Sequence, residues 1–303
     1  MPPAASHVSP NRWSILLASL AALLIATSWP AADRTHAAGA DAPSLAGTPI
    51  RSVYLRPPAS ARKDQPLQVL LALHGMGAEG ESFSSGLTDQ ADKYGWLVVA
   101  PTIIYGDWTD PAQVTREDPL LIRALIDYLD HIPERTGWQV RPEVLLLGHS
   151  RGAQLAHRFA EFRPDRVLGV AALSAGTYTL PGSGMGFPYG LEDLARYNAG
   201  KEFDASRFDD VPFWLGVGGD DTNPTDLPRQ WDRLEGTTRL QRAQTFESAL
   251  RELRVHAQLR VFSGAKHELT SDMRISACSF LNRVASGPRS AVLGRLAASP
   301  SPL

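Results

Sequence analysis

The sequence contains very little cysteine and no metal-binding pattern. Cys278 is the single cysteine among 303 residues, so no disulfide can form within the chain. The histidines show neither an H-x-H nor an H-E-x-x-H spacing, and one cysteine cannot build a zinc cluster. We therefore expect no metal and no other cofactor, and we expect Cys278 to be a small buried apolar side chain.

Strong net charge and basic clusters are also lacking. The formal net charge is −2 at pH 7, and no Lys/Arg cluster or basic strip with aromatic residues is present. This argues against a nucleic-acid partner. The apolar share of 43% and the charged share of 20% are ordinary for a globular protein and indicate neither disorder nor a multi-span membrane protein. The length suits one large α/β domain with additional ends.

Residues 1–40 have the composition of a targeting segment. Arg12 precedes an uncharged apolar run from Trp13 to Trp29, and small residues between 35 and 40 offer cleavage sites. We predict a signal peptide and therefore a secreted or periplasmic protein. The alternative is an uncleaved N-terminal anchor, because the run is near the lower length limit for a membrane span. Membrane contact is expected only in that case.

Apolar runs of strand length alternate with amphipathic segments from about residue 50 onward. Strands are expected at 51–56, 67–73, 96–100, 144–147, 167–173, 213–218 and 255–262, the first as an outer strand and the third ended by Pro101. Helices are expected at 81–94, from the Asp118-Pro119 pair to about residue 129, after residue 150, at about 238–253 and at 272–284. This alternation predicts the α/β class, with a mostly parallel sheet covered by helices on both faces.

The folded domain is expected to span residues 41–286. Within it, residues 174–210 are rich in glycine and aromatics and form a possible lid or insertion, because structureless segments of this length in compact domains are usually functional or disordered. Residues 287–303 are predicted to be a flexible tail.

The strongest motif is Gly148-His149-Ser150-Arg151-Gly152, which matches G-x-S-x-G between a buried strand and a helix. A serine on such a turn has a strained backbone, and flanking glycines let the chain double back without side-chain clashes. The turn exposes the serine hydroxyl beside a helix N-terminus, where a developing negative charge is stabilised. A chance match in a glycine-rich loop is the alternative, and the flanking strand and helix argue against it.

The motif and its surroundings resemble the α/β-hydrolase family over about residues 50–285. The resemblance depends on the chain order Ser150, Asp221, His267 and on the segments His74-Gly75-Met76-Gly77 and Gly264-Ala265-Lys266-His267. It implies the α/β-hydrolase fold and a Ser-His-Asp triad. More narrowly, the chain is similar to secreted esterases of the polyhydroxyalkanoate depolymerase and feruloyl esterase type. The chain has no appended binding domain and no disulfide cysteines, which argues against a polymeric substrate more than against ester hydrolysis.

The resemblance assigns a role to each member of the triad. Ser150 would attack a carbonyl carbon, and His267 would accept its proton and later give it to the leaving group. Asp221 is preferred over Asp220 as the acid because it lies three residues after Gly218, the spacing common in the family. The alternative role for these aspartates is a solvated loop charge or, with Asp226, a loose calcium loop.

The negatively charged oxygen that forms during the attack needs two backbone N–H donors. The resemblance places one at Arg151, directly after the serine, and one at Met76. For the Arg151 guanidinium we expect a surface ion pair, with recognition of a substrate carboxylate as the alternative. His149 is expected to pack beside the serine.

Specificity has a weaker signal. Aromatic residues in predicted loops at the active end could line a partly apolar ester pocket: Tyr105, Trp108, Tyr178 and Trp231, with Phe187 and Tyr189. Ordinary loop packing is the alternative for each. The leading hypothesis is an exported serine hydrolase of small or polymeric carboxylic esters. A serine peptidase of the same fold and a non-catalytic binding protein are the alternatives.

Overall fold

The structure is a computed structural model that describes residues 45–287. The predicted signal peptide or anchor at residues 1–40 lies outside the described residues, as does residue 288 onward of the predicted tail. None of the helices between residues 45 and 287 combines the length and the apolar character of a membrane span.

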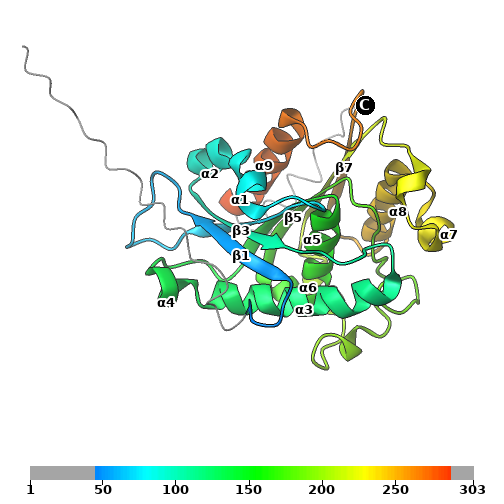
Figure 1. Ribbon diagram of the computed structural model, residues 1–303, viewed down its shortest axis with the longest axis horizontal. Coiled ribbons are helices and arrows are strands. Elements are labelled where there is room, and N and C mark those ends of the chain that lie inside the picture. The colour runs from blue at the N-terminus through cyan, green and yellow to red at the C-terminus, as the bar shows by residue number, and fades with distance from the viewer. Residues whose placement is uncertain (1–44, 288–303) are drawn as a thin grey trace, which may run out of the picture. The chain divides into compact units, whose positions relative to one another are not determined.

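Seven strands form one sheet, and six of them are parallel (Figure 1). Its spatial order is β1-β3-β2-β4-β5-β6-β7, and β1 alone is antiparallel, paired with β3 at the edge. The strands are β1 (Ile50–Arg56), β2 (Gln68–Leu73), β3 (Trp96–Ile103), β4 (Val144–His149), β5 (Val167–Leu173), β6 (Phe213–Gly218) and β7 (Ala257–Phe262). The predicted mostly parallel sheet with an outer first strand is confirmed.

The inner parallel strands β2, β4, β5 and β6 are almost wholly buried and mostly apolar because both faces of the sheet are covered there, whereas the last strand, β7, is half-buried and contains Gln258 and Arg260. In β2, Val69, Leu71 and Leu73 pack into one core, and the alternate residues Leu70 and Ala72 pack into a second core. The first core lies under α3, α5 and α8, and the second lies under α2 and α9. The alternation follows from the two-residue period of a strand.

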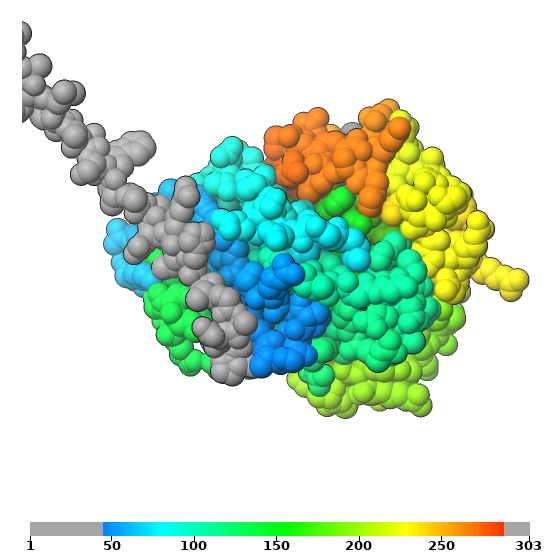
Figure 2. Space-filling view, viewed as in Figure 1, coloured from blue at the N-terminus to red at the C-terminus, as the bar shows by residue number. Residues whose placement is uncertain are grey.

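The helices form one layer on each side of the sheet. In Figure 1, α1, α2 and α9 lie on one side and α3 on the other. Figure 2 shows the α1–α2 segment, in cyan, beside the orange C-terminal helix α9, from the other end of the described chain. The helices are α1 (Gly80–Ser85), α2 (Thr88–Tyr94), α3 (Pro111–Asp130), α4 (Ile132–Thr136), α5 (Arg151–Phe162), α6 (Ala205–Phe208), α7 (Asp232–Glu235), α8 (Arg239–Glu252) and α9 (Ser271–Ser286).

Three predicted boundaries are wrong. The helix predicted at 81–94 is two helices, α1 and α2, separated at Gly86 and Leu87. β3 continues through Pro101, because β2 pairs with β3 only as far as Val99 and beyond that point β3 pairs only with β1. A proline there removes no hydrogen bond on the β2 side.

The third wrong boundary is the start of α3. The helix begins one Asp-Pro pair earlier than predicted, with Asp110 as the N-cap that accepts from Ala112 N–H and Pro111 at the first helical position. The predicted cap, Asp118, lies inside α3 and is fully buried. The sequence contains two Asp-Pro pairs eight residues apart, at 110 and 118. Either could begin the helix, and the choice between them requires knowing where the preceding strand ends.

The segment 174–210 is a long connection between β5 and β6. Its first part, residues 175–180, is completely buried, and its regular structure is the short helix α6 and a 3₁₀ turn at Leu194–Arg196. The early part of the predicted lid is therefore anchored in the core, and only the later part has exposed residues.

Candidate active site

Ser150 lies on a sharp turn between β4 and α5. Its backbone angles are φ 54° and ψ −118°, a region that residues with a side chain rarely adopt. The turn is held because Ser150 N–H donates to the Leu173 carbonyl of β5, while the Ser150 carbonyl accepts from Ala153 N–H in the first turn of α5. The strained serine predicted from the motif is therefore present at the carboxyl end of the sheet.

The two glycines of the motif are required by close backbone contacts. A Cβ on Gly148 would overlap the Gly152 carbonyl, and a Cβ on Gly152 would overlap the Leu73 carbonyl of β2. Backbone atoms of a packed strand or helix cannot move aside as a flexible side chain can. The absence of a side chain at Gly148 therefore lets the first turn of α5 pack on the end of β4, and its absence at Gly152 lets α5 approach β2.

Replacing Gly152 with alanine should lower stability by about 3 kcal/mol and the thermal midpoint by roughly 10 °C, because the new methyl group meets backbone. Thermal unfolding followed by circular dichroism measures the change. Gly219→Ala is the matched control, since its Cβ would lie 3.4 Å from the nearest atom, the Phe262 carbonyl oxygen, which is ordinary contact. Equal midpoints for the two variants would contradict the close approach.

Ser150, His267 and Asp221 form one chain of hydrogen bonds. The Ser150 hydroxyl is 2.9 Å from His267 Nε2, and His267 Nδ1 is 2.9 Å from Asp221 Oδ2. With the proton on Nδ1, the ring donates to Asp221 and accepts from Ser150. Such an arrangement can remove the serine proton during attack on a carbonyl.

The loops that carry Asp221 and His267 are packed directly on each other. They follow the neighbouring parallel strands β6 and β7, whose carboxyl ends lie at the same edge of the sheet. Asp220 N–H donates to the Ala265 carbonyl at 2.9 Å, and a Cβ on Gly218 would overlap the carbonyls of Ala265 and Lys266. Asp220 itself is exposed, whereas Asp221 is buried and faces the histidine. The structure thus brings Asp221, not Asp220, to His267.

His149 lies beside this hydrogen-bond chain, with its ring centre 5.2 Å from that of His267. Burial is the main cause and the nearby His267 a smaller one of a pKa of His149 that is lowered to about 4. Its imidazole is therefore neutral at pH 7 and adds no charge to the site.

Two main-chain N–H groups are available near the serine. Within residues 45–287, no hydrogen bond uses the N–H of Met76 or that of Arg151, the first residue of α5. The Met76 loop runs beside Ser150, since a Cβ on Gly75 would lie 3.2 Å from Ser150 Cβ. These are the donors that the sequence predicted for an oxyanion, and their catalytic role stays a prediction.

His74 fixes the orientation of the Met76 peptide. Ile103 N–H donates to His74 Nε2 at 2.9 Å, so the proton of the neutral ring is on Nδ1. That Nδ1–H donates to the Gly75 carbonyl at 2.6 Å. Because the peptide is planar and trans, the Met76 N–H points away from the His74 ring. His74 is fully buried, and burial lowers its pKa, which keeps the ring neutral.

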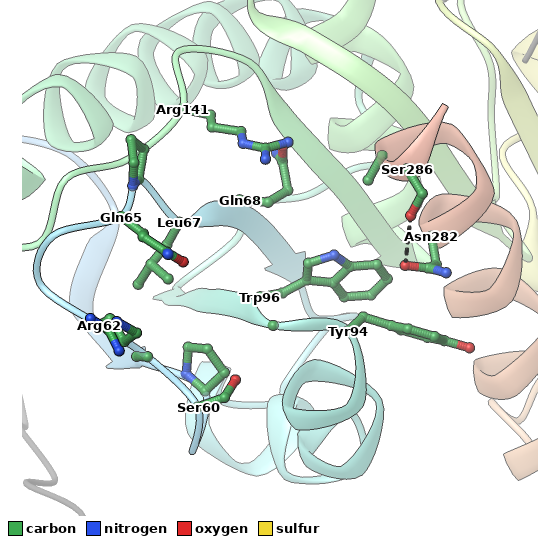
Figure 3. A pocket seen from close by; sticks show the side chains of 15 residues that line it. Ser60, Arg62, Gln65, Leu67, Gln68, Tyr94, Trp96, Arg141, Asn282 and Ser286 are labelled. Atoms are coloured by element: carbon green, nitrogen blue, oxygen red, sulfur yellow. Dashed lines mark hydrogen bonds between the residues drawn. The ribbon is translucent and has the colours of Figure 1, made fainter. Parts of the chain in front are cut away.

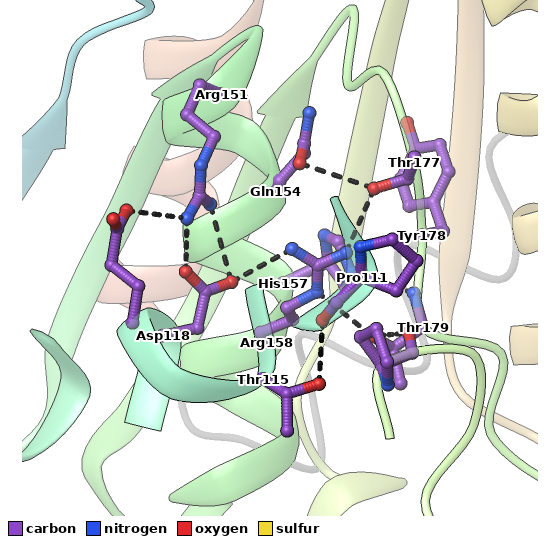
Figure 4. Close-up of polar contacts among 12 residues, drawn as sticks. Pro111, Thr115, Asp118, Arg151, Gln154, His157, Arg158, Thr177, Tyr178 and Thr179 are labelled. Atoms are coloured by element: carbon purple, nitrogen blue, oxygen red, sulfur yellow. Dashed lines mark hydrogen bonds and ion pairs between the residues drawn. The ribbon is translucent and has the colours of Figure 1, made fainter. Parts of the chain in front are cut away.

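The predicted surface ion pair of Arg151 is wrong. Its guanidinium is 1% exposed and donates to Asp118 and, at 3.2 Å, to Glu117 Oε1 (Figure 4). Asp118 also accepts from Arg158 at 2.9 Å, so one buried carboxylate joins two arginines of α5 to α3. These contacts anchor the helix that carries Ser150, and they leave the Arg151 guanidinium unavailable to a substrate.

The charges in this buried cluster compensate one another. Burial disfavours the ionised form of Asp118, but the charges and hydrogen bonds of Arg151 and Arg158 outweigh it and hold the Asp118 pKa below its usual value. Arg158 also donates to the Thr177 and Thr179 hydroxyls, which ties the start of the 174–210 segment to α5 (Figure 4). The sequence showed no signal for this cluster beyond the acidic pair itself.

Three of the four aromatic residues predicted to contact substrate are buried. Tyr178 and Trp231 have no exposed surface, and Tyr178 stacks on Phe246 with ring centres 4.4 Å apart. Tyr105 is 8% exposed and lies under the Arg151 guanidinium, 4.8 Å from its ring centre. The pocket-lining role predicted for these three residues is wrong in this structure, because the loops fold inward and use them as core. Trp108 is half-buried against Gly176 and stays a prediction.

Another buried carboxyl group, that of Glu235, contacts the main chain of Tyr178. Both oxygens of Glu235 accept from the Tyr178 N–H at 3.0 Å, and Glu235 is 1% exposed. Burial, only partly opposed by Arg242, raises the Glu235 pKa from 4.5 to about 8. The native protein therefore binds a proton at Glu235 at neutral pH that the unfolded chain releases.

This proton makes stability depend on pH. The Glu235 contribution is fully present below pH 4.5 and is lost as pH rises through about 8. Glu235→Gln cannot ionise, so its free energy of unfolding should fall less than that of the unmodified protein between pH 5 and 8. Urea unfolding at several pH values measures the difference, with the exposed Glu252→Gln as control. A slope for Glu235→Gln as steep as that of the control would contradict the assignment.

A polar pocket of about 430 Å³ lies at the amino ends of the strands, the end of the sheet opposite Ser150 (Figure 3). Its lining comes from the amino ends of β2 and β3, at Gln68 and Trp96, and from the end of α9, at Asn282 and Ser286. None of the predicted site residues lines it. Ligands of parallel α/β sheets bind at the carboxyl ends of the strands, where Ser150 lies, so this pocket has no part in the candidate site.

Metal ligands do not gather in the part of the chain that the structure describes. Between residues 45 and 287, no group of three or more His, Cys, Asp or Glu side chains could hold a metal ion. Asp226 is 4.0 Å from the cation of Arg239, which is unlike the calcium loop considered from the sequence.

Comparison with known proteins identifies the fold. No protein-family model and no curated protein sequence matches the chain. Solved structures do match, among them the poly(aspartic acid) hydrolase-1 of Sphingomonas sp. KT-1, with a TM-score of 0.60 at 22% identity over 76% of this chain and 92% of that one.

Two further matches carry esterase names. The Bacillus cereus carboxylesterase has a TM-score of 0.54 at 12% identity over 77% of this chain and 94% of that one. The CE1 ferulic acid esterase of Anaeromyces mucronatus has a TM-score of 0.52 at 16% identity over 78% of this chain and 86% of that one. At these identities the likeness shows the fold, and the α/β-hydrolase fold predicted from the sequence is confirmed.

Proposed function

We propose that this chain, which has the α/β-hydrolase fold, is an exported serine hydrolase that cleaves carboxylic esters. The observation that carries the proposal is the continuous hydrogen-bond chain from Ser150 through His267 to Asp221 at the carboxyl end of the sheet. A binding protein on this fold would not require all three groups in contact. The similar structures named as a carboxylesterase and a ferulic acid esterase support an ester as the substrate.

The proposed reaction has two halves. Ser150 Oγ attacks the ester carbonyl carbon while His267 Nε2 takes the hydroxyl proton, and Asp221 stabilises the imidazolium that forms. The carbonyl oxygen, now negative, accepts from the Met76 and Arg151 N–H groups. The C–O bond to the alcohol then breaks as His267 returns the proton to the alcohol oxygen. Water, activated by the same histidine, hydrolyses the acyl-serine ester and releases the acid.

Amide hydrolysis is the second candidate. It is favoured by the similar structure named as a poly(aspartic acid) hydrolase, since poly(aspartic acid) is joined by amide bonds. The same three side chains serve both reactions, but an amide has a poorer leaving group that needs fuller protonation.

Paired substrates separate these functions. The protein is assayed on p-nitrophenyl esters of increasing acyl length and on the matching p-nitroanilides, and in parallel with a fluorophosphonate probe that labels activated serines. We expect labelling and faster turnover of the esters. Faster turnover of the anilides would make the protein an amidase, and absence of both labelling and turnover would favour a binding protein.

A further inference from the structure

The carboxylate of Asp221 has a second cationic partner besides the histidine. Arg239 Nη1 donates to Asp221 Oδ1 at 3.0 Å, while His267 Nδ1 is 2.9 Å from Oδ2, so each oxygen has its own N–H donor. The side chains of Arg239 and Asp221 are 4% and 2% exposed. A buried arginine therefore lies behind the acid, on the side away from His267.

The position of Arg239 in its helix is unfavourable unless it has such a partner. It is the first residue of α8, after the N-cap Thr238, whose hydroxyl accepts from Gln241 N–H, and the first turn contains no acidic residue. A cation at a helix N-terminus is repelled by the positive end of the helix dipole. The contact with Asp221 compensates for this repulsion and for the burial of the guanidinium.

Asp221 in turn needs a cation to stay ionised. Burial opposes ionisation of Asp221, but the hydrogen bond from His267 and the charge of Arg239 outweigh it and keep the Asp221 pKa below its usual value. A neutral acid could accept only weakly from the histidine and could not stabilise a positive ring. A residue outside the triad, Arg239, thus contributes with His267 to the ionised state that the reaction requires.

We propose that Arg239 is a positioning residue for the proposed hydrolysis. It helps to keep Asp221 ionised, it holds Asp221 Oδ2 against His267, and it weakens the attraction of the Asp221 carboxylate for a proton on the His267 ring. The inference rests on the proposed function. It adds a fourth member to the hydrogen-bond chain, in the order Arg239, Asp221, His267, Ser150.

The effect of Arg239 on protonation of the His267 ring should change how activity depends on pH. A carboxylate already paired with one cation attracts a second cation less, so Arg239 disfavours the protonated ring that cannot accept the serine proton. The other titratable groups near Asp221 and His267 affect protonation of the His267 ring less. His149 is neutral at pH 7 because burial lowers its pKa to about 4, and Tyr178 is uncharged. Asp226 is 4.0 Å from Arg239 Nη1 and about half exposed, so solvent screens it.

Removing the charge of Arg239 should therefore move the acid limb of the kcat/KM profile. For Arg239→Gln we expect this limb to shift upward by roughly one pH unit and kcat on the plateau to fall roughly 10-fold to 100-fold. Arg239→Lys keeps a charge but not the planar geometry, so its limb should stay near that of the unmodified enzyme while kcat falls. The measurement is kcat/KM for a p-nitrophenyl ester between pH 4.5 and 9.

Arg242→Gln is the matched control. Arg242 lies one turn later in α8, is fully buried, and donates to the Gly176 and Pro228 carbonyls instead of a triad residue. Its loss should lower stability without moving the acid limb. An unmoved limb in Arg239→Gln, or an equal shift in Arg242→Gln, would overturn the proposal and leave Arg239 a structural residue.

A rescue experiment covers the case in which Arg239→Gln does not fold. Arg239→Ala leaves a space for a small cation, so guanidinium chloride at millimolar concentrations should restore part of the lost kcat, whereas equal urea or sodium chloride should not. Equal effects of guanidinium and urea would overturn the proposal. Fluorophosphonate labelling of the unmodified protein distinguishes this failure from failure of the proposed function, because the latter removes labelling and turnover before any substitution is made.

Discussion

Replacing Ser150 with alanine should abolish ester turnover and fluorophosphonate labelling while the protein stays folded. The change removes the oxygen that we propose attacks the carbonyl, the hydroxyl within hydrogen-bond distance of His267 Nε2. In serine hydrolases the loss of the nucleophile costs about 10⁵-fold or more in kcat. Turnover of a p-nitrophenyl ester measures the loss, and circular dichroism with thermal unfolding shows that the fold is kept.

Ser174→Ala is the control for this prediction. Ser174 follows β5, the strand next to β4, and also has a positive φ, of 49°, but its hydroxyl is buried and has no hydrogen-bond partner in the described part of the chain. Its removal should leave labelling intact. Labelling that persists in Ser150→Ala would place the nucleophile at another residue and remove the basis of the proposed function.

The second large effect is expected at Asp221. An asparagine there can donate its amide N–H to His267 Nδ1, which forces the ring proton onto Nε2 and prevents that nitrogen from accepting from Ser150. This change of tautomer costs about 10⁴-fold in kcat in a related triad. Asp221→Asn should show a loss of this order at pH 7, measured as kcat on the best ester substrate.

Asp220→Asn is the matched comparison, because Asp220 is the adjacent residue and its side chain is exposed. Its hydrogen bond to Ala265 comes from the main-chain N–H, which the substitution keeps. We expect less than about a twofold change in kcat. Equal losses in the two variants, or a larger loss in Asp220→Asn, would reject Asp221 as the acid. Asp221→Asn also removes the buried anionic partner of Arg239 and leaves only the half-exposed Asp226 at 4.0 Å, so the thermal midpoint of this variant must be measured before its kcat is interpreted.

The candidate site was predictable to the extent that its signals are local. A strand, a G-x-S-x-G turn and a helix follow one another within about twenty residues, and Ser150, Asp221 and His267 each lie at or shortly after the carboxyl end of a strand. Since the carboxyl ends of parallel strands share one edge, the three residues could be expected to meet. The preference for Asp221 over Asp220 came from the resemblance, because Asp221 has the spacing from Gly218 that is common in the α/β-hydrolase family.

The predictions that were wrong concern partners and burial. Arg151 was expected at the surface and is buried, because Asp118 of α3 neutralises it from a distance of thirty-three residues in the chain. Tyr105, Tyr178 and Trp231 were expected to face a substrate and are core residues. Arg239 had one indication in the sequence, a cation at a helix N-terminus after the cap Thr238, and the sequence does not say which acid compensates it.

The amino-acid sequence by itself determined the succession of strands and helices, the parallel sheet and the position of the serine turn, because periodicity, caps and glycines act between residues close in the chain. Only the tertiary structure decided which charges are buried and which acid each arginine meets. Ion pairing depends on distance in space, and the same Arg and Asp residues are equally compatible with a solvated surface until neighbouring helices bring them together and exclude water.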